Sequence, residues 1–168
     1  TGAVTVAGDL TVDTLGTFGG NYAVFLLGGG TVTTATSFAN AGVLTLGDDA
    51  GDALRFVGGL DATAVTAGTN TAGEIATTDT AMTLGAVTLT ADTDLDSGSA
   101  TLDVASVAGA AQRLALQSRT STGTVTIAGD LSVLALDTFS GAYNVTLNGG
   151  GTVTNDTTFL NSGVITLG

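Results

Sequence analysis

The first 47 residues of this chain return as residues 122–168, with 30 of 47 positions identical at a constant offset of 121 and no gap. Residues 7–10, Ala-Gly-Asp-Leu, recur for example as residues 128–131. Self-similarity at a fixed spacing is typical of elongated proteins in which each unit buries its apolar face against its neighbours. We therefore interpret residues 1–168 as one continuous domain and as a segment of a longer tandem array.

A shorter period of about 20 residues lies inside the long one. Three-residue strands with apolar flanks recur, and their central residue is threonine in all cases but one. The central residues are Thr5, Phe25, Thr45, Thr66, Thr88, Thr126, Thr146 and Thr166, at steps of 20, 20, 21, 22, 38, 20 and 20. Alternation of this kind places the apolar flanks on one face of a strand and the central residue on the other. The pattern predicts half-buried strands.

A repeated unit of about 20 residues with two or three short strands predicts an all-β fold, the parallel β-helix or β-solenoid, with roughly eight turns. The general preference for right-handed crossovers between parallel strands predicts a right-handed coil. We expect one inward ladder to contain Val4, Val24, Leu44, Val65 and Val87. The second copy should continue that ladder after the 38-residue step, so that 121 residues make six turns. The sequence leaves the register of residues 97–121 open.

Composition and charge exclude several classes of function. The chain has 15 acidic residues, three arginines and no lysine, which gives a net charge of -12. Nucleic acids and anionic membrane surfaces repel such a chain. The longest apolar run, residues 23–27, is far shorter than a membrane span, so we expect no membrane insertion. Histidine and cysteine are also absent, which removes the usual bases and nucleophiles, and we expect no catalytic residues and no enzyme activity.

Two stretches, residues 123–133 (Gly-Thr-Val-Thr-Ile-Ala-Gly-Asp-Leu-Ser-Val) and residues 87–96 (Val-Thr-Leu-Thr-Ala-Asp-Thr-Asp-Leu-Asp), carry a family resemblance. They resemble repeats of giant bacterial β-solenoid surface proteins, the filamentous-haemagglutinin-like and autotransporter-like adhesins. The resemblance implies an extracellular or cell-surface fibre, either a filament or an adhesin stalk. The alternative is an adhesin binding module that recognises a glycan or a cell surface. Neither implies a catalytic residue.

The expected partner of the coil is the coil itself. An uncapped solenoid ends in open strand edges that pair readily with another chain. Residues 1–10 and 163–168 resemble ordinary interior turns, so we expect either continuation of the same chain or end-to-end stacking of copies. Outward Phe25, beside alanines, suggests lateral packing of rods as well. Ice binding requires two adjacent outward threonine columns, and the sequence predicts only one.

Calcium is the one cofactor that the sequence suggests. Asp92, Asp94 and Asp96 alternate, and Asp103 follows Asp92 by eleven residues, as in an EF-hand calcium loop. The run departs from that loop at Ser97, where a glycine belongs, and at Asp103, where a glutamate belongs. Because alternate residues of a strand share a face, the competing interpretation is a solvated face with the three acids pointing outward together.

A second acidic cluster contains Asp48, Asp49 and Asp52. It resembles the Gly-Asp turns of calcium-binding nonapeptide repeats, although one Gly-x-Asp step does not make such a repeat. The competing interpretation is an acidic turn that binds no metal.

Overall fold

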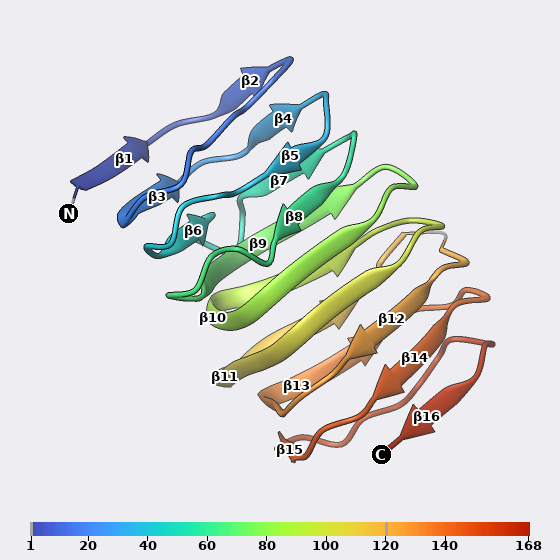
Figure 1. Ribbon diagram of the computed structural model, residues 1–168. Helices are drawn as coiled ribbons and strands as arrows, with labels where there is room; N and C mark the ends of the chain where they lie inside the picture. The colour runs from blue at the N-terminus through green and yellow to red at the C-terminus, as the bar shows by residue number, and fades with distance from the viewer. Residues whose placement is uncertain (1, 120) are drawn as a thin grey trace.

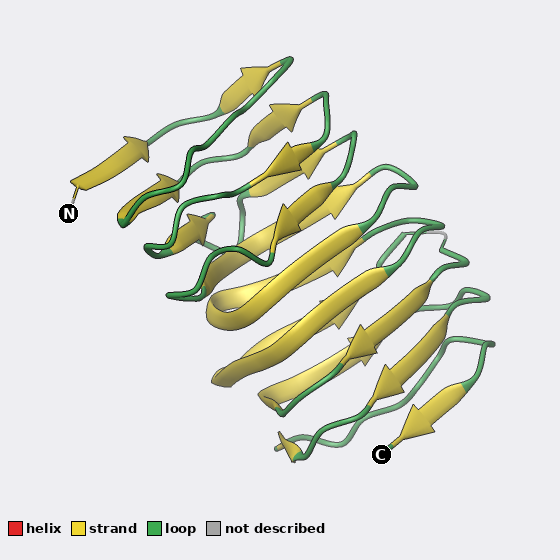
Figure 2. Ribbon diagram, viewed as in Figure 1, coloured by secondary structure: helices red, strands yellow, loops and turns green. Residues whose placement is uncertain are grey.

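The chain forms a parallel β-solenoid. The computed structural model describes residues 2–119 and 121–168, which contain 16 strands and no helix. Every strand pair is parallel, and the pairs connect successive turns of about 20 residues into a stack of about eight turns. Figures 1 and 2 show the resulting coil, with the two termini at opposite ends of the stack. The predicted architecture is confirmed. No helix in the described residues is long and apolar enough to cross a membrane.

Each turn has three faces, which we name A, B and C in the order in which the chain crosses them. Face A consists of β1 (Gly2–Val6), β3 (Tyr22–Leu26), β6 (Leu44–Leu46), the start of β9 (Thr69–Thr77), the middle of β10 (Met82–Asp96) and of β11 (Leu102–Leu116), the start of β13 (Leu131–Thr138), and β15 (Gly151–Val153). Face B consists of β2 (Leu10–Val12), β4 (Gly30–Val32), β7 (Ala53–Phe56) and the ends of β9, β10, β11 and β13. Face C consists of β5 (Thr36–Ser37), β8 (Leu60–Ala62), the starts of β10 and β11, β12 (Thr124–Ile127), β14 (Asn144–Leu147) and β16 (Ile165–Leu167). The previously open residues 97–121 thus include β11, which crosses all three faces.

Inward side chains stack into ladders that fill the narrow core. On face A the ladder runs through Val24, Leu44, Thr69, Val87 and Val107. All five are at most 4% exposed. Burying apolar side chains contributes about 25 cal/mol per Å² of surface removed from water, so these ladders are the main source of stability.

The face A ladder corrects one predicted member. Leu44 pairs with Thr69 and not with Val65, because the chain from Leu44 to Thr69 takes 25 residues, with a long acidic corner between faces A and B. Val65 is buried at the corner between faces C and A, outside the ladder. The prediction failed because it followed the apolar–Thr–apolar pattern, whereas the true member is itself a threonine.

The second copy of the repeat lies on different faces from the first. Val4 stacks on Val24 in face A, whereas its equivalent Val125 stacks on Leu102 and Val145 in face C. Face A is crossed at Val4, Val24, Leu44, Thr69, Val87 and Val107. From Val107 the chain crosses face B and reaches face C at Val125. The 121-residue offset therefore spans five and two-thirds turns and not the six predicted, because several corners hold extra residues.

The two copies nevertheless form the same local structure. Asp9 Oδ1 accepts a hydrogen bond from the Gly29 N–H at 3.0 Å, and Asp130 Oδ1 accepts one from the Gly150 N–H at 3.1 Å. The first contact lies at the corner between faces A and B, the second at the corner between faces C and A. Two placements of the repeat that differ by one face are therefore interchangeable for this sequence.

Candidate functional site

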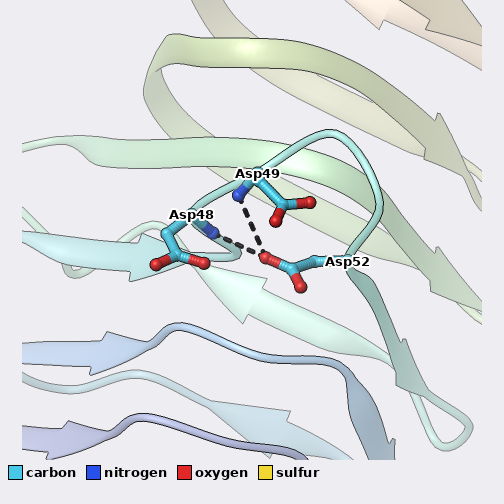
Figure 3. A group of neighbouring side chains, drawn as sticks. All are labelled: Asp48, Asp49 and Asp52. Atoms are coloured by element: carbon cyan, nitrogen blue, oxygen red, sulfur yellow. Dashed lines mark hydrogen bonds between the residues drawn. The ribbon is translucent and has the colours of Figure 1, made fainter.

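The acidic turn of residues 48–52 joins β6 to β7 at the corner between faces A and B (Figure 3). Asp52 Oδ2 accepts hydrogen bonds from the N–H groups of Asp48 at 2.8 Å and Asp49 at 3.1 Å. Asp49 Oδ1 accepts the N–H of Gly51 at 2.6 Å. The carboxylates of Asp48, Asp49 and Asp52 each bring one oxygen within 4.8 Å of the others. The structure thus brings all three predicted residues together.

The hydrogen bonds separate the acidities of two of these groups. The pKa of Asp52 is lowered, chiefly because its carboxylate accepts the Asp48 N–H. The pKa of Asp48 is raised by desolvation at the turn and by the hydrogen bond and charge of Asp52, with the charge of Asp49 added. Because the Asp48 side chain is exposed to solvent, we attribute its raised pKa to the neighbouring carboxylates rather than to desolvation. Asp52 therefore carries its charge to lower pH than Asp48.

The chemistry of the turn fits a structural role as well as it fits a cation site. Calcium takes six to eight oxygen ligands, and three carboxylates provide part of such a set. One oxygen of Asp52 is already occupied by two N–H donors that close the turn. Calcium binding here stays a prediction.

The other candidate set is dispersed. Asp92 lies at a corner between faces A and B, where its carboxylate accepts the Arg113 N–H at 2.8 Å. Asp94 faces outward on face B. Asp103 lies on face C, opposite Thr83 in the strand register. Asp48, Asp49 and Asp52 are the one group of three acids with clustered oxygens in residues 2–119 and 121–168.

Asp96 corrects the expectation that the three alternate acids point to solvent together. It is fully buried, with Oδ1 accepting the Gly98 N–H at 2.8 Å and Oδ2 accepting the Arg119 N–H at 2.7 Å. The cause is a cover of residues 117–119, in which the Arg119 N–H binds Asp96 and the Arg119 side chain reaches Glu74 on face B. The alternation pattern of a single strand does not reveal this cover. Asp94, beside it, has a raised pKa, first because of burial and also because of the charge of Asp96.

Sequence reasoning missed a polar network that involves Gln117, Arg119 and Ser121. Gln117 is fully buried in a left-handed conformation, φ 59°, and its Oε1 accepts the Ser97 N–H at 2.8 Å. The Arg119 side chain pairs with Glu74. Burial and the charge of nearby Arg55 lower the pKa of Arg119. The sequence contains no signal for this network, because Gln117 and Arg119 bind partners that lie 20 and 45 residues earlier in the chain.

Charge is distributed unevenly over the three faces. The strand segments of face A contain no acidic residue and no arginine. The segments of face B contain Arg55, Glu74, Asp94, Asp96, Arg113 and Asp137, and those of face C contain Asp61 and Asp103. The remaining charged residues lie at corners and in loops. One long face of an acidic rod is therefore uncharged.

Comparison with protein-family models, with curated proteins and with solved structures finds no match to this chain. The family resemblance of the two repeat phrases remains a prediction. The function of the chain therefore rests on the coil, the two copies of the repeat and the surfaces of the coil.

Proposed function

We propose that this chain is a structural segment of a secreted or cell-surface bacterial fibre, a filament or an adhesin stalk. The observation that carries the proposal is the pattern of agreement between the two copies of the repeat. They agree at nearly all inward strand positions and at most corner glycines, and they differ mainly at outward strand positions and at other loop positions. A chain whose role is to extend a coil needs its inward ladders, whereas a chain that binds a ligand through its surface needs particular outward residues.

The strands of the first two turns illustrate the pattern. Inward Val4, Val24 and Leu26 have identical counterparts in the second copy, Val125, Val145 and Leu147. The outward residues Ala3, Ala23, Phe25 and Leu27 are replaced by Thr124, Asn144, Thr146 and Asn148. Substitution of apolar by polar residues at four outward positions leaves the strands and their register intact. This supports a role in building the rod.

Each turn of the coil covers the inward side chains of its neighbour. Val4 in the first turn is 54% exposed, whereas Val24, stacked upon it, is 4% exposed. Leu167 in the last strand is 67% exposed. Open strand edges with exposed apolar side chains pair readily with further strands, so axial stacking of copies is the self-association that we propose. Each added turn lengthens the rod by about 4.8 Å.

Secretion and a location outside the cell rest on the family resemblance. A net charge of -12 suits a surface fibre, since it keeps rods apart and dispersed. The expected partner is the same protein, and nucleic acid is unfavourable on electrostatic grounds.

Electron microscopy of the purified chain at increasing concentration tests the proposal. The structural role predicts rods whose length grows with concentration, because stacking adds whole coils to the ends. Rods of constant length that bind a glycan array or a cell surface would contradict it and favour the adhesin module.

A further inference from the structure

The large apolar side chains that this rod exposes lie at its two ends. Within the part of the chain that the structure describes, none of them belongs to a turn between the ends. Val4 and Phe18, which are 54% and 80% exposed, belong to the first turn, and the last turn contains Leu160, Val164 and Leu167. Figure 1 shows these two turns at opposite ends of the stack. Apolar surface gathered in this way is typical of a contact with another molecule.

The repeat shows what covers such residues inside the stack. Val125, the counterpart of Val4 in the second copy, is fully buried between turns on both sides. Leu46, the counterpart of Leu167 in the first copy, is fully buried because Thr71 of the next turn lies over it. The end residues therefore occupy ladder positions that one further turn would bury.

We propose that two copies of this coil dock head to tail without rotation, so that Phe18 of one copy lies over Leu167 of the other. The inference rests on the proposed function, because it gives axial stacking a single geometry. In every turn the chain passes from face C to face A. A second copy that places its β1 over β15 therefore continues the coil where β16 leaves it. Strands added in this way are parallel to their neighbours, as the strands within the coil are.

The inward ladder of face C carries the pairing of Phe18 with Leu167. This ladder runs through Phe38, Ala62, Leu84, Val104, Ile127, Leu147 and Leu167. The parallel bridge between Gly20 and Asn40 places Phe18 one turn before Phe38 in the same register. Phe18 therefore begins the ladder that Leu167 ends, and docking places one side chain over the other.

A hollow at the carboxy-terminal end fits the docked copy. Its volume is about 230 Å³, and its lining includes Gly151 and Leu167. Gly30, the counterpart of Gly151, is covered by Leu54 of the following turn, which is buried. The register of face A places Val4 of a docked copy over Gly151, because Val4 begins the inward ladder that Gly151 ends. A side chain then fills the hollow, as Leu54 does over Gly30.

A second copy of the coil suits these ends better than another partner does. A single strand of another protein pairs with one face, whereas the same coil meets all three faces at once. The first and last turns contain three acids, Asp9, Asp13 and Asp156, all outside the strands, and no arginine. Their mutual repulsion acts through water, so stacking should tighten as ionic strength rises. Weaker stacking at high salt would indicate an interface held by ion pairs and would overturn the proposal.

Two end variants and their mixture test the contact. Phe18→Glu and Leu167→Glu each place a carboxylate at one end, where docking would bury it. The control, Thr88→Glu, adds the same charge at an exposed position midway along face A. We expect each end variant alone to associate at least about 100-fold more weakly than the wild type and the control. Because each end variant keeps one intact end, an equimolar mixture should form a species of twice the 16.2 kDa of one chain and nothing longer.

Sedimentation velocity separates the outcomes. Dimers of either end variant alone would show that like ends meet, and would overturn the head-to-tail contact. Wild-type rods combined with a mixture that stays monomeric, or with end variants that stack as tightly as the control, overturn this inference and leave the proposed function standing. A wild type that forms no rods at any concentration contradicts the proposed function and this inference together, and leaves the ends to a different occupant.

A disulfide tests the register and keeps the test valid if a charged variant misfolds. The chain has no cysteine, and neighbouring ladder positions lie about 4.8 Å apart, within the Cα–Cα range of a disulfide. Oxidised Phe18→Cys/Leu167→Cys should therefore form a series of linked oligomers that reduction converts back to single chains. Phe18→Cys/Val153→Cys would link copies rotated by one face, because Val153 lies on face A, and it should stay largely monomeric. The reverse result overturns docking without rotation.

Discussion

The side chain of Arg119 reaches back across two turns of the coil and pairs with Glu74, 45 residues earlier in the chain. The contact holds the Arg119 side chain over face B, beside buried Asp96, whose Oδ2 accepts the Arg119 N–H. It joins turns that the strand ladders already connect, but it does so on the outside of the coil.

Removal of this contact should loosen the cover. We expect Arg119→Gln to lower the free energy of unfolding by about 1 kcal/mol, since the pair is partly shielded from water. Arg113→Gln is the control, because Arg113 is as exposed as Arg119 but pairs with more exposed carboxylates, Asp92 at 3.7 Å and Asp137 at 3.1 Å. Urea unfolding measures both variants. An equal loss in both would show that the cover adds nothing beyond a surface ion pair.

Thr69→Val should stabilise the protein. The Thr69 hydroxyl is buried without a hydrogen-bond partner among the described residues, in a ladder between Leu44 and Val87. Valine keeps the branched shape and removes the unsatisfied oxygen, so we expect a gain of about 1 kcal/mol. Thr71→Val is the control, since the Thr71 hydroxyl lies 3.3 Å from that of Thr93. Thermal unfolding should show a higher Tm for the first variant only.

Two equivalent glycines should be indispensable on two different faces. Gly30 and Gly151 have φ of 128° and 123°, and an added Cβ would collide with the carbonyl oxygens of Leu10 and Leu131, respectively. We expect Gly30→Ala and Gly151→Ala each to cost about 2 kcal/mol or more in stability. Gly8→Ala, whose Cβ would meet no atom within 4 Å, should change stability by less than about 0.5 kcal/mol. Chemical denaturation of the three variants would contradict this if Gly8→Ala were the most damaging.

Asp94→Asn should raise stability at neutral pH. Burial raises the pKa of Asp94 above the value of about 3.9 expected for the unfolded chain. Between these two values the folded state holds more protons than the unfolded state, so the contribution of Asp94 to stability falls as pH rises through this window. The variant should therefore have a higher Tm than the wild type at pH 7, and the difference should shrink below about pH 4.

Asp52→Asn should change the Tm at pH 7 in the opposite direction to Asp94→Asn. Acceptance of the Asp48 N–H lowers the pKa of Asp52, so its contribution is present above the unfolded pKa and is lost as pH falls through the folded one. The variant should have a lower Tm than the wild type at pH 7 and approach it at low pH. Parallel pH profiles for Asp94→Asn and Asp52→Asn would contradict both assignments.

The repeat and the short strands were enough to predict the coil, because a period near 20 residues has few other physical solutions. Val4, Val24 and Leu44 stack as predicted. The face of Val125 was beyond prediction, since it depends on how many residues each corner between Leu44 and Val125 contains. Corner lengths leave no trace in the alternation of strands.

One candidate site could also be predicted from the sequence, and the other could not. Asp48, Asp49 and Asp52 are close in sequence, and a tight turn necessarily brings them together. The burial of Asp96 depends on Arg119, 23 residues later, which reaches it only after a further turn of the coil. Contacts of that kind follow from the register and could not be read from the acidic run alone.

Interchangeable faces have a consequence at the level of the gene. Unequal recombination between the two copies would delete or duplicate 121 residues and shift everything beyond the crossover by one face. Because Asp9 and Asp130 make the same corner contact on different sides of the rod, the rejoined chain would still wind continuously. A protein of this construction can gain or lose length in a single genetic event and keep an unbroken coil.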